Sequence, residues 1–165
     1  MSAAATSKRL NLAVQYASRA DGLPTRAEIR SWVRAALDAD GPRGGQIAIR
    51  FVDAGESRAL NRQYRGKDRP TNVLSFAYAN APLIQGDLVI CAPVAGREAA
   101  EQGKSPTAHH AHLIVHGVLH LLGHDHETND AAARRMEDKE REILASLGFG
   151  DPYEDGNGQG GPGRF

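Results

Sequence analysis

The chain lacks the features that would place it in a membrane or in an oxidising compartment. Cys91 is its single cysteine, so no disulfide can form within the chain and a reducing compartment is the natural fit. No apolar run approaches the roughly 18 residues that a membrane span needs. The first residues are not followed by the uninterrupted apolar core of a signal peptide. Together these absences predict a cytoplasmic protein that does not bind membranes.

The chain also lacks net charge, because 20 basic residues balance 20 acidic ones. Bulk charge therefore indicates no class of partner. The distribution is uneven, however: residues 50–69 hold six basic side chains against three acidic ones, whereas residues 125–155 hold ten acidic against four basic. This asymmetry predicts a molecule with one positive and one negative side.

A length of 165 residues is enough for one domain with its own core. Half of the last ten residues, GNGQGGPGRF, are glycine, and the segment cannot bury a core. We therefore expect a single metal-dependent hydrolase domain over residues 1–155 and a disordered glycine-rich tail over residues 156–165.

Hydrophobic periodicity predicts strands interleaved with helices. The expected strands cover residues 9–17, 46–53, 72–78 and 87–91. Helices are expected over residues 25–40, 55–64, 93–103 (a solvated helix), 105–122 and 130–147. This pattern predicts an α+β fold, with a single small mixed β-sheet packed with helices around a central metal-bearing helix. The order of the strands does not follow from the sequence.

The most informative stretch covers residues 116–126 and reads His-Gly-Val-Leu-His-Leu-Leu-Gly-His-Asp-His. His116 and His120 are four residues apart, so on a helix they project from one face and can bind one metal ion. Gly123 favours a helix end, after which the chain can return His126 to the same ion. Three protein ligands leave a coordination position open, which is typical of a catalytic, zincin-like zinc site.

Other histidines and acids in this region allow weaker interpretations. A buried histidine-rich helix without a ligand is the alternative to a metal site, but three histidines with a glycine at the turn argue against it. His109 and His112 share the helical stripe, and we expect them to be solvated or core histidines. His124 or Asp125 could orient a ligand from the turn.

The spacing of these histidines matches the metalloprotease motif His-Glu-x-x-His-x-x-Gly-x-x-His. The glutamate is missing, because Gly117 stands in its place. In the proteases that glutamate is the general base that activates the metal-bound water. A metalloprotease is therefore a disfavoured alternative, and a different reaction on a similar site is the better hypothesis.

Arginines form a second group, spaced four and three residues apart on one face of the helix expected over residues 55–64 and its extension: Arg58, Arg62 and Arg65. Leu60 and Tyr64 are expected to anchor the opposite face to the core. The basic run continues to Lys67 in the following loop. Guanidinium groups bind phosphate oxygens bidentately, so this surface can bind phosphate, although a solvated basic face explains the spacing equally well.

Two separated segments resemble the bacterial YbeY family. They are residues 60–76, LNRQYRGKDRPTNVLSF, and residues 116–126, HGVLHLLGHDH. Residues 86–91, GDLVIC, and the Asp-Pro-Tyr sequence at 151–153 are similar to that family too. The resemblance covers most of residues 45–155 and includes the glycine that follows the first histidine.

The resemblance implies a metal-dependent endoribonuclease involved in ribosomal RNA maturation and ribosome quality control. It implies a zinc ion held by His116, His120 and His126, and a role in activity for Arg65. The partners that it implies are ribosomal RNA precursors, with ribosomal subunits or ribosomal proteins as further candidates. The histidine spacing indicates a metal site independently, whereas the RNA substrate rests chiefly on the resemblance.

We therefore expect a zinc-dependent endoribonuclease that cleaves single-stranded or loop RNA. Arg65 is the expected catalytic residue, and the expected substrate-binding residues are Arg58, Arg62 and Lys67. An RNA-binding ribosome-assembly factor with a structural zinc site is the main alternative, which a fourth protein ligand would favour. The sequence identifies neither the nucleophile, water or the 2′-hydroxyl, nor a general base.

Overall fold

The structure is a computed structural model that describes residues 9–124 and 129–154. The described residues form one four-stranded sheet in the order β1-β2-β4-β3, composed of β1 (Leu10–Ala17), β2 (Gly45–Val52), β3 (Val73–Ala79) and β4 (Ile84–Cys91). β1, β2 and β4 run parallel, and β3 is antiparallel to β4. The prediction of an α+β fold with a single mixed sheet is confirmed. β1 and β3 are the two edge strands.

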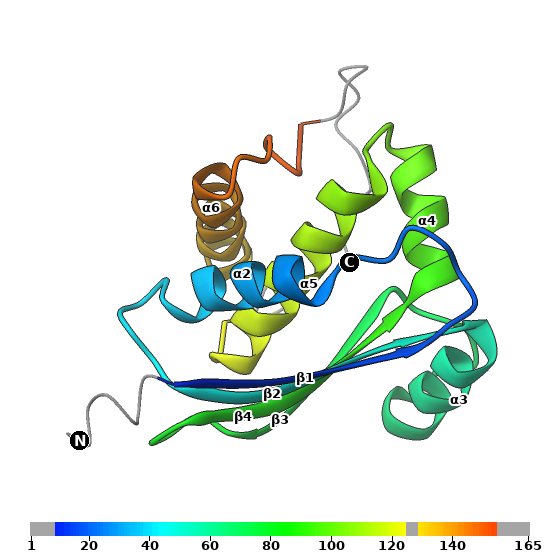
Figure 1. Ribbon diagram of the computed structural model, residues 1–165, viewed down its shortest axis with the longest axis horizontal. Coiled ribbons are helices and arrows are strands. Elements are labelled where there is room, and N and C mark those ends of the chain that lie inside the picture. Colours follow the sequence, from blue (N-terminus) through cyan, green and yellow to red (C-terminus); the bar gives the residue numbers. More distant parts are fainter. Residues whose placement is uncertain (1–8, 125–128, 155–165) are drawn as a thin grey trace.

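Five helices occur within the described residues: α2 (Arg26–Leu37), α3 (Ala54–Arg65), α4 (Ala92–Glu101), α5 (Pro106–Leu121) and α6 (Asp130–Ser146). In Figure 1, α2, α4, α5 and α6 lie on one side of the sheet, and α3 lies outside this layer at the end of the sheet, where it contacts α4 and β4. α5 contacts the other three helices of its layer and also β3 and β4. None of the helices in the described ranges is long and apolar enough to cross a membrane.

Capping residues set several helix ends where the sequence predicts them. Thr25 and Glu28 form the capping box of α2, in which each side chain binds the backbone N–H of the other residue. The Ser105 hydroxyl accepts a hydrogen bond from the Ala108 N–H at the start of α5. Gly123, with φ of +99°, follows the end of that helix. The bounds of α5 are therefore explained by its caps.

Two expectations for the elements need correction. β4 begins at Ile84 rather than at residue 87, because Ile84 is fully buried and pairs with Gly45 of β2. α4 is not a solvated helix, since it buries one face against the core, made of Ala92, Val94, Ala95 and Ala99. Three of these four side chains are alanines, which give a weak hydrophobic period, so the buried face was not visible in the sequence.

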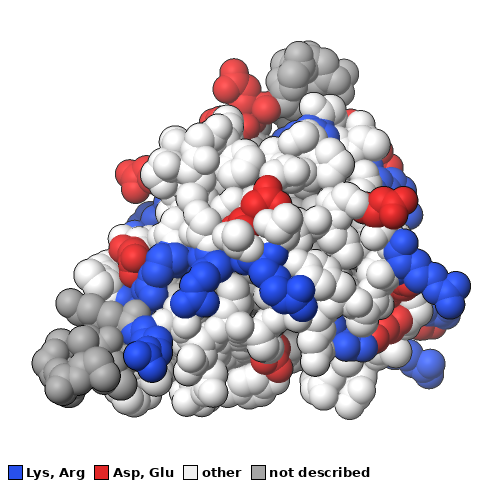
Figure 2. All heavy atoms as spheres, viewed as in Figure 1, with Lys and Arg blue, Asp and Glu red and all other residues white. Residues whose placement is uncertain are grey.

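The outer edge of β1 is covered by arginines from α2. Arg30 donates to the Leu10 carbonyl (3.0 Å) and Arg26 donates to the Val14 carbonyl (3.2 Å). Figure 2 shows a row of basic side chains across the face where α2 lies. Unpaired carbonyls of an edge strand can recruit another strand. These arginines satisfy them instead, so this part of the positive surface has a structural role.

α5 approaches β4 closely at two glycines. A Cβ atom on Gly86 would lie 2.6 Å from Leu121 Cδ2 and 2.9 Å from the carbonyl oxygen of Phe76. A Cβ atom on Gly117 would lie 2.7 Å from Leu88 Cδ2. A leucine of the helix therefore occupies the space above the strand glycine, and a leucine of the strand occupies the space above the helix glycine. This reciprocal contact holds α5 directly on β4.

Replacing Gly86 by alanine should destabilise the protein, because the new methyl group would collide with a backbone oxygen that cannot move freely. We expect the free energy of unfolding to fall by about 1–3 kcal/mol, the usual cost of overpacking. Denaturant-induced unfolding followed by circular dichroism measures this change.

The matched control is Gly96→Ala in α4, where an added Cβ would meet no atom within 4 Å. That change should stabilise the protein by roughly 0.5–1 kcal/mol, because alanine is the better helix former. Equal effects of the two substitutions would contradict the close approach of α5 to β4.

Candidate functional site

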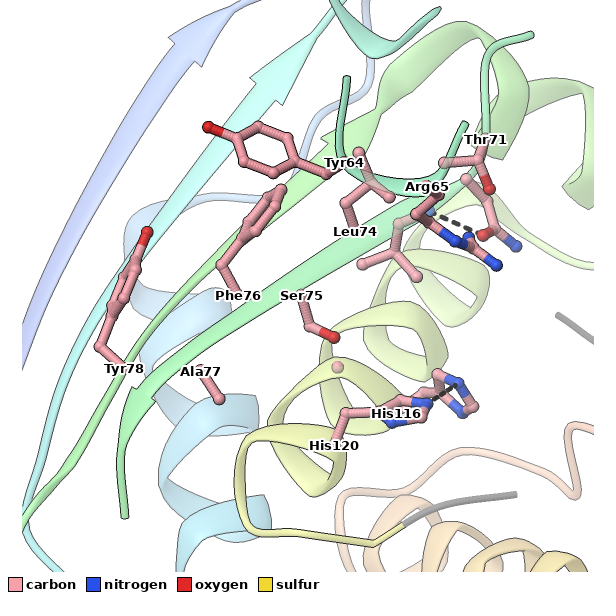
Figure 3. A pocket seen from close by; sticks show the side chains of 13 residues that line it. Tyr64, Arg65, Thr71, Leu74, Ser75, Phe76, Ala77, Tyr78, His116 and His120 are labelled. Atoms are coloured by element: carbon pink, nitrogen blue, oxygen red, sulfur yellow. Dashed lines mark hydrogen bonds between the residues drawn. The ribbon is translucent and has the colours of Figure 1, made fainter. Parts of the chain in front are cut away.

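His116 and His120 lie on the face of α5 next to the one that contacts β4. Their Nε2 atoms are 3.1 Å apart and line a hollow of about 530 Å³. His116 is buried and His120 is partly exposed, so the pair sits where the helix surface opens to the hollow. Figure 3 shows the two rings lying side by side, with Ser75 of β3 pointing toward them. The structure thus brings together two of the three predicted metal ligands.

The two ring nitrogens fit a shared zinc ion. Zn–N bonds of about 2.0–2.1 Å in tetrahedral geometry would separate two ligand nitrogens by roughly 3.3 Å, close to the 3.1 Å seen between the Nε2 atoms. The third predicted ligand, His126, lies outside the described residues. Within residues 9–124 and 129–154, no group of three or more His, Cys, Asp or Glu residues could hold a metal ion. The three-histidine zinc site therefore stays a prediction.

A buried carboxylate from α6 orients His116. The Nδ1 atom of His116 lies 3.0 Å from Glu140 Oε1, and Glu140 has 0% exposure. A hydrogen bond from Nδ1–H to the carboxylate places the proton on Nδ1 and leaves the Nε2 lone pair for a ligand. Histidines that bind metals are commonly held by a carboxylate in this way, which also raises their basicity. Glu140 is therefore a positioning residue for His116.

Glu140 is the centre of a buried polar network. His112 Nε2 lies 3.2 Å from the carboxylate, and the Tyr153 hydroxyl donates to it at 2.6–2.7 Å. Burial alone would raise the pKa of Glu140, but the hydrogen bonds and the electrostatic attraction of His112 and His116 together outweigh it and hold that pKa well below its usual value. Burial and the neighbouring carboxylate raise the pKa of Tyr153, so its phenol stays protonated and donates. Glu140 is thus an ionised acceptor at neutral pH.

Glu140 was not among the site residues predicted from the sequence. The sequence feature that could have indicated it is a carboxylate in the apolar stripe of α6, four residues after Met136 and three before Ile143. The residue expected to orient a ligand, His124, instead contacts Asp40, with 3.0 Å between Nε2 and Oδ2. The alternative orienting residue, Asp125, lies outside the described residues.

The remaining histidines of α5 are core residues. His109 is buried and contacts Glu98, with 2.9 Å between Nε2 and Oε1. Burial, together with the neighbouring His109, lowers the pKa of His110 to about 4, so His110 is neutral at physiological pH. Of the two alternatives left open for His109 and His112, the buried one is confirmed.

Of the basic residues predicted to act on RNA, Arg65 is the one that lines the same hollow as the two histidines. It is the last residue of α3, which ends at Gly66 in the left-handed conformation (φ +71°). Arg65 and Tyr64 line the same hollow as His116 and His120 (Figure 3). Arginine and the histidine pair therefore share one solvent-accessible space.

α3 is anchored by polar residues rather than by Leu60 and Tyr64, so that expectation was wrong. Ser57 and Asn61 are its buried residues, and their side chains bind the backbone of the loop that leads into β3. The Ser57 hydroxyl donates to the Thr71 carbonyl at 3.0 Å, and the Asn61 amide donates to the Arg69 carbonyl at 2.8 Å. These hydrogen bonds fix the end of the helix, where Arg65 lies.

The other predicted substrate-binding residues lie outside the lining of the hollow. Arg58 forms a bidentate ion pair with Asp68, at 2.7 and 3.0 Å. Arg62 and Lys67 are exposed on the same part of the surface. The structure thus separates Arg65 from these three residues, whose role in binding RNA remains a prediction.

At position 117, where the metalloprotease motif has its glutamate base, close packing against β4 leaves no room for a side chain. Gly117 faces Leu88, and a Cβ atom there would lie within 3.0 Å of both of its methyl carbons. Leu88 is fully buried in β4, so it has little freedom to move. A glutamate at this position would have to displace the buried Leu88 side chain, which agrees with the expectation of a reaction other than peptide hydrolysis.

Comparison with known proteins identifies the family. The model of the family described as Endoribonuclease YbeY matches residues 15–148. The chain belongs to this family. It is 53% identical to the Endoribonuclease YbeY of Halorhodospira halophila, covering 88% of this chain and 97% of the relative. It is 56% identical to that of Stenotrophomonas maltophilia strain R551-3, covering 88% and 94%.

A solved structure shares the fold of this YbeY-family chain. The solution structure of a Thermotoga maritima protein matches with a TM-score of 0.55 at 22% sequence identity, covering 81% of this chain and 91% of that one. The arrangement of helices around the mixed sheet is therefore found in an experimentally determined structure.

Replacing Glu140 by glutamine should weaken binding of the predicted zinc ion by roughly 10- to 100-fold, because His116 would lose the carboxylate that orients it. Competition with a chromogenic chelator measures the affinity. The control is Glu142→Gln, which removes an exposed carboxylate from the same helix. Equal zinc affinities in the two variants would show that Glu140 does not position the ligand.

Proposed function

We propose that this YbeY-family chain is a zinc-dependent endoribonuclease that cleaves phosphodiester bonds of single-stranded RNA. The observation that carries the proposal is the convergence of the Nε2 atoms of His116 and His120 in a hollow that Arg65 also lines. Relatives that are more than half identical over most of the chain are named Endoribonuclease YbeY. Both the site and the family support an activity on RNA.

Each residue has a separate task in this proposal. A divalent ion held by His116, His120 and His126 would polarise a phosphoryl oxygen or activate a water molecule. Glu140 keeps the proton of His116 on Nδ1, so that Nε2 remains a ligand. Arg65 binds a phosphate oxygen and stabilises negative charge that develops in the transition state.

We further propose a role in ribosomal RNA processing, ribosome maturation and ribosome quality control. The substrates would be ribosomal RNA precursors in the cytoplasm, and ribosomal subunits or ribosomal proteins would be partners. The support is the resemblance of residues 60–76 and 116–126 to the YbeY family. Single-stranded segments and loops expose their phosphates and bases, whereas a duplex does not, so they suit an open hollow at a sheet edge.

The metal site predicts about one equivalent of zinc per chain by elemental analysis of the purified protein. His116→Ala, His120→Ala and His126→Ala should each deplete the metal, because two remaining ligands bind zinc much more weakly than three. His124→Ala is the control, since its ring contacts Asp40, and it should retain zinc. Full zinc content in His126→Ala would contradict the proposed ligand set.

Arg65→Ala should separate metal binding from catalysis. Loss of one donor aimed at developing charge typically lowers the rate by about 10²–10³-fold, whereas the zinc content should stay unchanged because Arg65 belongs to α3 and not to the ligand-bearing helix. Cleavage of a fluorescent single-stranded RNA under single-turnover conditions measures the rate. Arg97→Ala, which removes an exposed arginine from α4, is the matched control.

Cleavage at the wild-type rate by Arg65→Ala with its zinc in place would show that Arg65 belongs to a solvated basic surface. If wild-type protein with zinc bound cleaves no RNA, the alternative of an assembly factor with a structural zinc site would be favoured.

A further inference from the structure

Three aromatic side chains line the hollow opposite the histidines. They come from the end of α3 and from β3: Tyr64, Phe76 and Tyr78. Figure 3 shows their rings following β3 on the side away from His116 and His120, while Ser75 points to the histidine side. The hollow therefore extends from the histidine pair, past the edge of the sheet, to a row of rings.

Two of these rings are more exposed than core packing would require. Tyr64 is 59% exposed and Tyr78 is 66% exposed. Tyr16, the other large hydrophobic side chain that is exposed within the described residues, is 37% exposed. It has partners within the protein, because it stacks on Phe51 and its hydroxyl donates to the Pro24 carbonyl. Exposed aromatic rings gathered in one hollow mark a binding surface.

The rings are held in place before any ligand binds. Tyr64 packs edge-on against Phe76, with ring centroids 5.0 Å apart and an interplanar angle of 70°. The Tyr78 hydroxyl donates to Asp87 of β4 at 2.8 Å. Holding the rings in this way reduces the entropy lost when a flat ligand stacks on them.

A β-bulge directs the third ring. The register of β3 against β4 shifts between Ala77 and Ala79, which makes Tyr78 the extra residue of the strand. Bulges re-aim a side chain and often occur next to binding sites. β3 also has no neighbouring strand on its outer side within the described residues. The edge beside the rings is thus accessible to an extended ligand.

We propose that Tyr64, Phe76 and Tyr78 form a stacking platform for unpaired nucleobases adjacent to the phosphodiester held at the histidines. This inference rests on the proposed function and names how the same site selects single-stranded RNA. Aromatic side chains stack on bases splayed out of single strands, and bases inside a duplex are not available to them. Arg65 directly follows Tyr64 in the sequence and lines the same hollow as the rings and the histidines, so it binds the connecting phosphate.

The test measures binding of an eight-nucleotide 2′-O-methyl oligoadenylate to the full-length zinc-loaded protein by fluorescence anisotropy, and gel electrophoresis checks that the RNA is still intact after the measurement. Tyr64→Leu and Tyr78→Leu keep an apolar side chain but remove the ring. Each should weaken binding by about fivefold to a hundredfold, the range measured for loss of one base–aromatic stack. Tyr64→Phe keeps the ring and should bind as the wild type does.

The salt dependence of binding separates stacking from phosphate contacts. The leucine variants should keep the wild-type slope of log Kd against log salt, because they remove no cation, whereas Arg65→Ala should lower the slope. Tyr16→Leu is the matched control, since it removes a tyrosine that lies outside the hollow, and it should leave affinity unchanged. Circular dichroism confirms that each variant is folded.

An oligonucleotide with abasic sites completes the test. It should bind the wild type more weakly than oligoadenylate does, with no further loss in Tyr64→Leu. Wild-type affinity for oligoadenylate in both leucine variants would overturn the platform while leaving the endoribonuclease proposal intact. A zinc-loaded wild type that neither binds nor cleaves single-stranded RNA at low salt would overturn both.

Discussion

The close contact between α5 and β4 determines the geometry of the whole site. Gly117 and Leu121 are four residues apart and face the strand, where they meet Leu88 and Gly86. His116 and His120 each precede one of these residues, so they lie about 100° further round the helix. Because of this rotation, the two imidazoles face the hollow at the edge of the core instead of the sheet. Any change that lifted α5 from the sheet would therefore also move the histidine pair.

The site depends equally on a buried charge that joins three parts of the chain. Glu140 of α6 contacts His112 and His116 of α5 and the hydroxyl of Tyr153 after α6. Removing one partner from a buried pair of this kind typically costs about 3–5 kcal/mol, because the other charge is left without compensation. α6 therefore contributes to the orientation of the histidines as well as to the core. Folding and site assembly are energetically linked.

The sequence predicted the features that depend on local interactions. The caps at Thr25 and Ser105, the helix stop at Gly123 and the pairing of His116 with His120 follow from spacings of three or four residues, and the structure confirms them. The mixed sheet also followed from the alternation of strands and helices.

Features that depend on distant contacts could not be predicted. Strand order places β4 between β2 and β3, and no local pattern encodes that choice. Glu140 acts on a residue 24 positions away, so its role appears only when α6 packs on α5. The anchoring of α3 was misread because Ser57 and Asn61 hold it through hydrogen bonds to a loop, which hydrophobic periodicity does not reveal.

The outer edge of β1 is covered by arginines, whereas the outer edge of β3 is accessible. Each edge therefore limits strand pairing between copies of the chain in a different way. The carbonyls of Leu10 and Val14 on β1 are already bound by Arg30 and Arg26, which disfavours extension of the sheet by a second chain there. β3 is interrupted by the bulge at Tyr78, which disfavours a long intermolecular ladder. In the proposed complex this edge carries RNA, whose backbone cannot continue a β-sheet. The bound RNA and the bulge would then both prevent another copy of the chain from pairing with β3.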